Sequence, residues 1–249
     1  MSKEIEKSNS CVQKTSTGRR IVSTGMMAGL QVSLGQVELP RMFNQLVLFV
    51  LDGSGSMNGL GISGKTKGYE VHSSVINVLE RLRESKNKNS FDISFFAFAE
   101  ESVEMFPIKS LAHYNLSKDC FNPCEYLNNR GRTSLCSSLA QTKEIALDYL
   151  EKNKNSNSKV IIIILGDGAI EDFENCYKIK QELDQHEKIN YSTVLLETPE
   201  WQEKYEDVLG QIQEEFKSLA SDGAFYLSTV DPNEVRKHMI KSITKVSQL

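Results

Sequence analysis

The chain has 249 residues, of which 39% are hydrophobic and 25% charged, and its formal net charge is -4. This composition is ordinary for a globular protein, the length allows one large domain, and the lack of a basic block argues against nucleic acid as a partner. The longest apolar run, residues 160–165, is far too short to span a bilayer, so no membrane association is expected.

Residues 1–41 are rich in Ser, Thr, Gly and Lys, and we expect them to form a partly flexible N-terminal extension. Leu30, Val32 and Leu34 alternate with polar or small residues, which is compatible with one short added strand. The first twenty residues contain no apolar core of the kind that a secretory signal needs. We therefore expect a cytoplasmic protein.

The five cysteines are an odd number without a secretory context, which predicts free thiols. A zinc site is left open by four residues that lie within one stretch, although their spacing contains no C-x-x-C pair: His113, Cys120, Cys124 and Cys136.

From residue 42 onward, strand and helix signals alternate along the chain. Apolar or alternating runs predict strands at residues 46–51, 91–99, 102–108, 160–165, 191–196 and 224–228. Apolar residues at helical spacing predict helices within residues 71–82, 139–150, 175–187 and 201–219. A last helix has a clear start signal, with Asp231 as cap, Pro232 in the first helical position and Glu234 where a capping box places its acid.

This alternation predicts the α/β class, with a doubly wound, mostly parallel central sheet and helices on both faces. The run at 102–108 follows its predecessor so closely that only a tight antiparallel connection fits, which makes it the one antiparallel edge strand. Runs that are apolar throughout, such as residues 46–51, suit strands covered by helices on both faces.

Two aspartates directly follow such buried strands, and both should lie at the edge where ligands bind in sheets of this kind. Asp52 follows the strand at 46–51, and Asp167 follows Gly166 after the strand at 160–165. Alternate residues of an extended segment point the same way, so Ser54 and Ser56 can converge with Asp52 on one point. Carboxylates and hydroxyls are hard oxygen ligands, which suit magnesium, calcium or manganese.

A competing motif begins a few residues later. Residues 59–66, GLGISGKT, match the phosphate-binding pattern G-x-x-x-x-G-K-[ST], so the alternative is a P-loop-type nucleotide-binding hydrolase that uses Lys65, Thr66 and Asp167. A phosphate loop must run from a strand end straight into a helix, whereas here the strand ends well before Gly59. We interpret the octet as the lead-in to the first helix, with Lys65 and Lys67 on the surface.

Three segments together resemble the von Willebrand factor type A (VWA) domain: LFVLDGSGSM, then Gly131-Arg132-Thr133-Ser134-Leu135 before a helix, then VIIIILGDGA. The resemblance covers roughly residues 44–248 and implies a Rossmann-like VWA domain at 42–249. It also implies a complete metal-ion-dependent adhesion site (MIDAS) of the intracellular type, made by Asp52, Ser54, Ser56, Thr133 and Asp167. The family's usual Thr-Asp-Gly is Gly166-Asp167-Gly168 here, which is a departure.

The charge of such a site predicts what it binds. Two aspartates roughly neutralise a divalent ion, and neutral hydroxyls donate weakly, so the ion retains affinity for one more anionic oxygen. An Asp or Glu carboxylate of a protein partner can supply that oxygen. We therefore expect a non-enzymatic protein-binding module that depends on Mg²⁺, or on Mn²⁺ or Ca²⁺, and the resemblance implies an intracellular scaffold or adaptor. The histidines are scattered, and none neighbours a motif: His72, His113, His186 and His238.

Overall fold

The computed structural model describes residues 43–198 and 206–248. The expected N-terminal extension, its short strand through Leu30, Val32 and Leu34, and the start of the helix expected at 201–219 lie outside these residues. The strands are β1 (Phe43–Asp52), β2 (Phe91–Phe98), β3 (Ser102–Ser110), β4 (Asn157–Gly166), β5 (Ile189–Leu196) and β6 (Tyr226–Thr229). The helices are α2 (Lys67–Arg83), α3 (Cys136–Lys152), α4 (Phe173–Leu183), α6 (Glu206–Leu219) and α7 (Pro232–Gln248).

The six strands form one sheet in the order β3-β2-β1-β4-β5-β6. All neighbouring strands are parallel except β3, which runs antiparallel to β2 at the edge. The predicted doubly wound, mostly parallel sheet with one antiparallel edge strand is therefore confirmed. The chain proceeds from β1 outward to β3 and then returns to β4 on the other side of β1, so the strand order reverses between β1 and β4.

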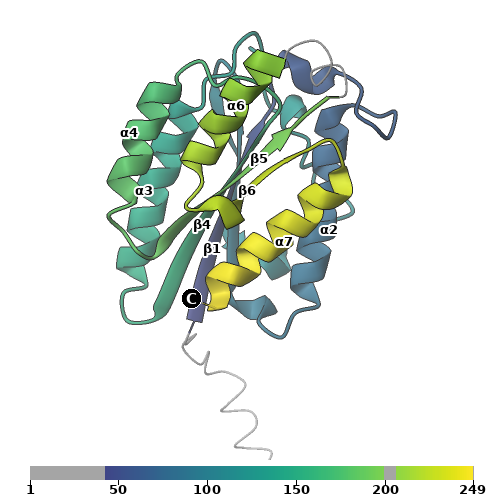
Figure 1. The fold of residues 1–249 in the computed structure, drawn as a ribbon. Coiled ribbons are helices and arrows are strands. Elements are labelled where there is room, and N and C mark those ends of the chain that lie inside the picture. Colours follow the sequence, from purple (N-terminus) through teal and green to yellow (C-terminus); the bar gives the residue numbers. More distant parts are fainter. Residues whose placement is uncertain (1–42, 199–205, 249) are drawn as a thin grey trace, which may run out of the picture. The chain divides into compact units, whose positions relative to one another are not determined.

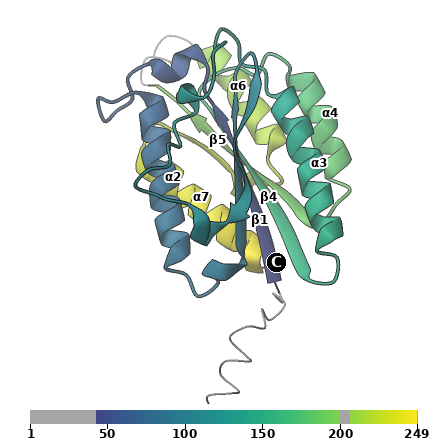
Figure 2. The same ribbon diagram turned by 180° about the vertical axis from the view of Figure 1, so that it is seen from behind.

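Helices cover both faces of the sheet, with α2 and α7 on one side and α3, α4 and α6 on the other (Figures 1 and 2). Successive side chains of β1 point to opposite faces, and both sets are fully buried. Val47, Phe49 and Leu51 pack in the core beneath α2 and α7, whereas Leu46, Leu48 and Val50 pack in the core beneath α3, α4 and α6. This is why β1 and β4 are continuous apolar runs in the sequence.

The segment that follows β1 is held close to the body of the domain. The Gly53 N–H donates to the Phe98 carbonyl at 2.9 Å. A Cβ atom at Gly53 would lie 2.6 Å from the Leu127 side chain and 3.0 Å from the Pro123 carbonyl carbon, so only glycine allows this approach. Across the part of the chain that the structure describes, no helix combines the length and apolar character needed to cross a bilayer.

Candidate metal-binding site

Asp52 and Asp167 lie at the carboxyl edge of the sheet, at the point where the strand order reverses. Asp52 is the last residue of β1 and Asp167 follows the last residue of β4. The two strands are direct neighbours, with Leu51 paired to Leu165. Both aspartates are buried, with exposed fractions of 0% and 2%. The topology therefore brings two carboxylates that are far apart in the sequence to the place where open α/β sheets bind ligands.

A chain of hydrogen bonds joins these aspartates through two serines. The Ser54 N–H donates to Asp52 Oδ1 at 2.7 Å, and the Ser54 and Ser56 hydroxyls lie 2.9 Å apart. The Ser56 hydroxyl then donates to Asp167 Oδ1 at 2.6 Å. A single 3₁₀ turn, η1 (Gly55–Asn58), begins directly after Ser54 and contains Ser56. Four of the five predicted site residues are thus brought together.

Thr133, the fifth predicted residue, lies in the loop before α3. Its N–H donates to Glu171 Oε1 at 3.3 Å, and its carbonyl accepts from the Glu171 N–H at 3.0 Å. The same loop also contacts the segment after β1, because the Gly55 N–H donates to the Arg130 carbonyl at 2.8 Å. Within the described residues, however, no hydrogen bond joins the Thr133 hydroxyl to the other four site residues. In the described part of the chain, the loop that contains Thr133 is therefore held near the site by backbone hydrogen bonds and not by the Thr133 hydroxyl.

Asp172 fixes this loop to the segment that follows β4. Its carboxylate accepts from the Leu135 N–H and the Cys136 N–H, each at 2.9 Å, and from the Ser134 hydroxyl. Asp172 therefore caps the N-terminus of α3 from another part of the chain. This residue was not among the predicted site residues, and its role depends on contacts that no local sequence pattern reveals.

One carboxylate oxygen of Asp52 lacks a hydrogen-bond donor in the part of the chain that the structure describes. Among the described residues, Asp52 Oδ2 is buried and has no hydrogen-bond partner. Gly166 approaches it closely, since a Cβ there would lie 3.2 Å from this oxygen. Burial, and then the nearby charge of Asp167, raise the pKa of Asp52 from 3.8 to about 7. A buried acceptor without a donor is unfavourable, and a cation would satisfy it.

The residues present therefore fit a hard divalent cation. The assembled donors are carboxylate and hydroxyl oxygens, which suit Mg²⁺, Mn²⁺ or Ca²⁺ better than softer metals. The zinc site left open by the sequence is not supported. In the described part of the chain, no group of three or more His, Cys, Asp or Glu residues could hold a metal, and the described cysteines are free thiols.

Lys67 lies in the site, which contradicts the prediction that it is on the surface. Its exposed fraction is 6%, and its Nζ lies 2.5 Å from Asp167 Oδ2. The helical pattern contained a signal for this, since Lys67 is the first residue of α2 and stands one turn before Val71, on the buried face. Lys65 does lie on the surface, with its Nζ 4.0 Å from the centre of the Tyr69 ring.

The glycine-rich octet forms a closed hairpin that ends at the N-cap of α2, Thr66. Several of its backbone N–H groups donate within the protein. The Gly61 N–H donates to the Lys65 carbonyl at 2.7 Å, and the Ser63 N–H donates to Glu70 Oε1 at 2.8 Å. A phosphate loop needs free N–H groups directed at its ligand, and the Glu70 carboxylate would repel phosphate. The interpretation of the octet as a lead-in to the helix agrees with this geometry.

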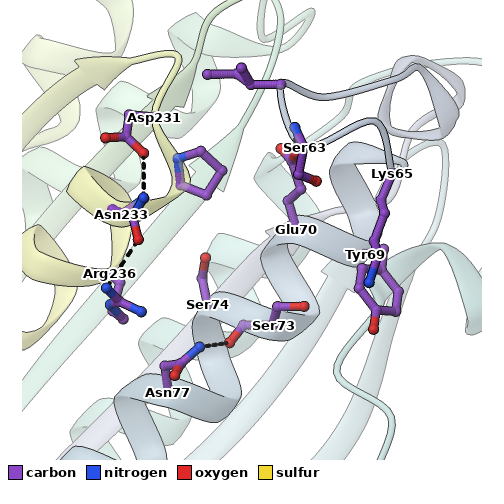
Figure 3. Close-up of a pocket in the computed structure, with 12 residues that line it drawn as sticks. Ser63, Lys65, Tyr69, Glu70, Ser73, Ser74, Asn77, Asp231, Asn233 and Arg236 are labelled. Atoms are coloured by element: carbon purple, nitrogen blue, oxygen red, sulfur yellow. Dashed lines mark hydrogen bonds between the residues drawn. The ribbon is translucent and has the colours of Figure 1, made fainter.

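A pocket of about 460 Å³ lies between this hairpin, α2 and the start of α7 (Figure 3). Figure 3 shows Lys65 alongside Tyr69, while Glu70, Asp231 and Arg236 belong to other parts of the lining. Acidic and basic side chains thus both line the pocket, which is not the lining of an anion site. None of the five predicted site residues lines it.

The chain resembles known proteins both in its sequence profile and in its fold. The sequence profile of the von Willebrand factor type A domain matches residues 47–238. No curated protein sequence matches the chain. The minor pilin PilB from Streptococcus sanguinis is similar in structure, with a TM-score of 0.62, 14% identity, and coverage of 85% of this chain and 63% of that one.

Two further solved structures have the same fold. Proximal thread matrix protein 1 from the mussel byssus, in a form with a zinc-occupied MIDAS motif, gives a TM-score of 0.56 at 15% identity over 83% of this chain. This chain spans 46% of that protein's length. BatB from Bacteroides thetaiotaomicron gives a TM-score of 0.55 at 15% identity, covering 83% of this chain and 100% of that one. Because the family profile covers most of the chain and the sheet agrees with the fold, the chain belongs to the von Willebrand factor type A domain family.

Proposed function

We propose that residues 42–249 form a divalent-cation-dependent protein-binding module with a MIDAS. The ion is held by Asp52, Ser54, Ser56, Thr133 and Asp167, and it completes its coordination with an Asp or Glu carboxylate of a protein partner. Domains of this family are commonly metal-dependent protein-binding modules. The observation that carries the proposal is the pair of buried carboxylates at the reversal point of the sheet, one of which has an oxygen without a donor within the described residues.

The hydrogen bonds of the site are compatible with ion binding. A serine hydroxyl can offer a lone pair to a cation while its O–H continues to donate to a carboxylate. Ser56 can therefore serve the ion and still donate to Asp167, which orients that carboxylate. A bound Mg²⁺, Mn²⁺ or Ca²⁺ would supply a centre that accepts one further anionic oxygen. The zinc-occupied MIDAS of the mussel protein supports a divalent ion in sites of this family.

We propose a role without catalysis, as a cytoplasmic scaffold or adaptor. Ser192 and His238 do form a hydroxyl–imidazole pair at 3.0 Å. Ser192 is fully buried and His238 is 9% exposed, so a substrate has no access to them. The free thiols of the described cysteines support a reducing compartment.

The alternative, a P-loop-type nucleotide hydrolase, is favoured by the octet pattern alone. One experiment separates the two functions. The melting temperature is measured with Mg²⁺ or Mn²⁺ alone, with ATP or GTP alone, and with metal and nucleotide together. We expect metal alone to raise the melting temperature, and nucleotide to add nothing beyond chelating the ion. Asp52→Ala should abolish the rise that metal causes. Lys65→Ala should leave the metal effect intact. A nucleotide-dependent shift that Lys65→Ala removes would favour the hydrolase.

Partner binding is tested separately by affinity capture from the native host. Capture should require Mg²⁺, be reversed by EDTA, and be lost in Asp52→Ala but retained in Lys65→Ala. A partner whose capture is insensitive to EDTA and to Asp52→Ala would argue against ion-mediated binding.

A further inference from the structure

The ion pair between Lys67 and Asp167 differs from the others in the described part of the chain. Its two side chains are 8% and 0% exposed. In each of the other ion pairs, at least one side chain is more than a quarter exposed. Exposed pairs contribute little to stability, whereas removing one partner of a buried pair leaves an uncompensated charge.

Lys67 provides only part of the positive charge that the site can accept. Asp167 is fully engaged, because Oδ1 accepts from Ser56 and Oδ2 accepts from the Lys67 ammonium. Asp52 accepts from the Ser54 N–H at Oδ1 and has no donor at Oδ2 within the described residues. With both carboxylates ionised, one ammonium leaves a net charge of −1 at the site. The ammonium thus occupies the place of a cation without completing the neutralisation.

Lys67 lies at the N-terminus of α2, where the helix dipole disfavours a positive charge. Lys67 is the first residue of α2, and a cation at a helix N-terminus is unfavourable because the positive end of the helix dipole lies there. The Lys67 N–H donates to the Gly59 carbonyl at 3.0 Å. Val71 and Val75 lie on the same face of α2 as Lys67 and pack in the core, which fixes the direction of that face. The contact with Asp167 offsets the unfavourable dipole interaction. Among the residues that the structure describes, Asp167 is the one acid paired with this buried ammonium, which assigns Lys67 to the site.

We propose that Lys67 is a tethered cation of this site, which stabilises the carboxylates in the metal-free protein and opposes the divalent ion. The inference rests on the proposed function, since it places the ion beside Asp52 and Asp167. With the ion bound, the two carboxylates, the ammonium and the ion sum to a net charge of +1, whereas without Lys67 the sum is zero. Lys67 therefore lowers the affinity for the metal itself and leaves excess positive charge, which favours a partner's carboxylate.

The test uses Lys67→Met, which removes the charge, and Lys67→Gln, which also keeps an N–H donor for Asp167. Mg²⁺ and Mn²⁺ affinities are measured by titration calorimetry on the full chain, together with the melting temperature in EDTA. We expect both variants to bind metal at least about tenfold more tightly, the effect of a unit charge near a divalent ion even at the screening of water. In EDTA, Lys67→Met should melt roughly 5–10 °C lower than the wild type. Lys65→Met, which removes a neighbouring exposed lysine, should change neither quantity.

The outcomes separate this inference from the function on which it rests. Should the variants melt lower but bind metal with equal or weaker affinity, Lys67 has a structural role only, and the inference falls while the proposed function stands. Lack of metal uptake by the wild type and by both variants overturns both ideas. Uptake by the variants but not by the wild type supports the tethered cation and contradicts metal dependence of the natural protein. If Lys67→Met does not fold, Lys67→Gln decides the affinity comparison.

Discussion

Asp52 and Asp167 have different surroundings at the carboxyl edge of the sheet. Asp167 has a hydrogen-bond donor for each oxygen, namely Ser56 and Lys67. Asp52 has a donor for only one oxygen within the described residues, and its pKa is raised to about 7. The burial that accompanies a central strand disfavours the charged form, and so does the neighbouring carboxylate. A bound cation beside Asp52 would therefore favour its charged form.

His238 is a second titratable residue in the core. It lies in α7 with an exposed fraction of 9%, and its Nε2 is 3.0 Å from the Ser192 hydroxyl and 3.2 Å from the Phe225 carbonyl. Burial lowers the pKa of His238 below its usual value of 6.5. The folded protein therefore favours neutral imidazole, while the unfolded chain takes up a proton below pH 6.5. The stability from this group is present above that pH and is lost as the pH falls below it.

We expect His238→Gln to reduce this acid dependence, because glutamine stays neutral and can still donate to the Phe225 carbonyl. The free energy of unfolding is measured by urea denaturation between about pH 7.5 and pH 5.5, and the wild type should lose stability through His238 as the pH falls through 6.5. The matched control is His186→Gln, at an exposed position, which should keep the wild-type slope. Equal slopes for wild type and His238→Gln would show that this histidine is not responsible.

At the scale of elements, the site depends on how helix α3 begins. Asp172, from the segment after β4, accepts two backbone N–H groups at the start of α3 and thereby fixes the Thr133 loop to that segment. We expect Asp172→Ala to lower the free energy of unfolding by about 1–3 kcal/mol, the effect of losing a helix cap and leaving buried donors unsatisfied. It should also weaken Mg²⁺ binding severalfold, because the loop is less well held. Urea denaturation and titration calorimetry measure these two effects.

Glu174→Ala is the control, because Glu174 is an exposed acid in the first turn of the neighbouring helix α4. It removes the same charge without removing a cap, so both quantities should remain near the wild-type values. If Asp172→Ala lowers stability but leaves the Mg²⁺ affinity unchanged, the Thr133 loop does not contribute to ion binding.

The strands and helices were predictable because burial on both faces leaves a strong pattern in the sequence. The apolar run at residues 160–165 predicted β4, but β4 begins at Asn157. The polar start was missed because it is set by pairing with β1, as between Phe43 and Asn157, and not by hydrophobicity. At the start of α7, Glu234 accepts from the Thr229 hydroxyl, a contact outside the predicted capping pattern.

The site was predictable only as far as local pattern and family resemblance reached. Asp52 and Asp167 follow from the ends of apolar strands, whereas Thr133 entered through the resemblance alone. The position of Lys67 was predicted wrongly. Its place one turn before Val71 favoured the buried face, but its partner Asp167 lies 100 residues away in the sequence. The capping role of Asp172 was missed, because the N–H groups that it caps at the start of α3 are 36 and 37 residues away. Such contacts depend on the topology that brings the strand ends together.

At the scale of the whole domain, three separate segments meet at the carboxyl edge of the sheet: the loop after β1, the loop before α3 and the loop after β4. Hydrogen bonds connect these segments to one another, including Gly55 to Arg130 and Glu171 to Thr133. The central strands beneath them are paired along their length and buried except at their first residues. Local opening therefore needs less free energy in these loops than in the strands. An ion that binds all three segments would stabilise their closed arrangement in particular.

We expect Mg²⁺ to slow amide hydrogen exchange in residues 53–59, 130–135 and 167–172. We expect little change in β1 and β4, because their buried, paired amides should exchange slowly even without the ion. Binding to the folded state alone adds about 2.7 kcal/mol at an ion concentration of about 100 times Kd, which corresponds to roughly a hundredfold slower exchange of amides that open only without the ion. Exchange measured by mass spectrometry with Mg²⁺ and with EDTA tests this, and Asp52→Ala should remove the difference. Protection confined to residues 53–59 would mean that the ion contacts only the loop after β1. Protection of all three segments together would mean that the ion links the ends of β1 and β4 to the start of α3, which is the arrangement that a partner's carboxylate would meet.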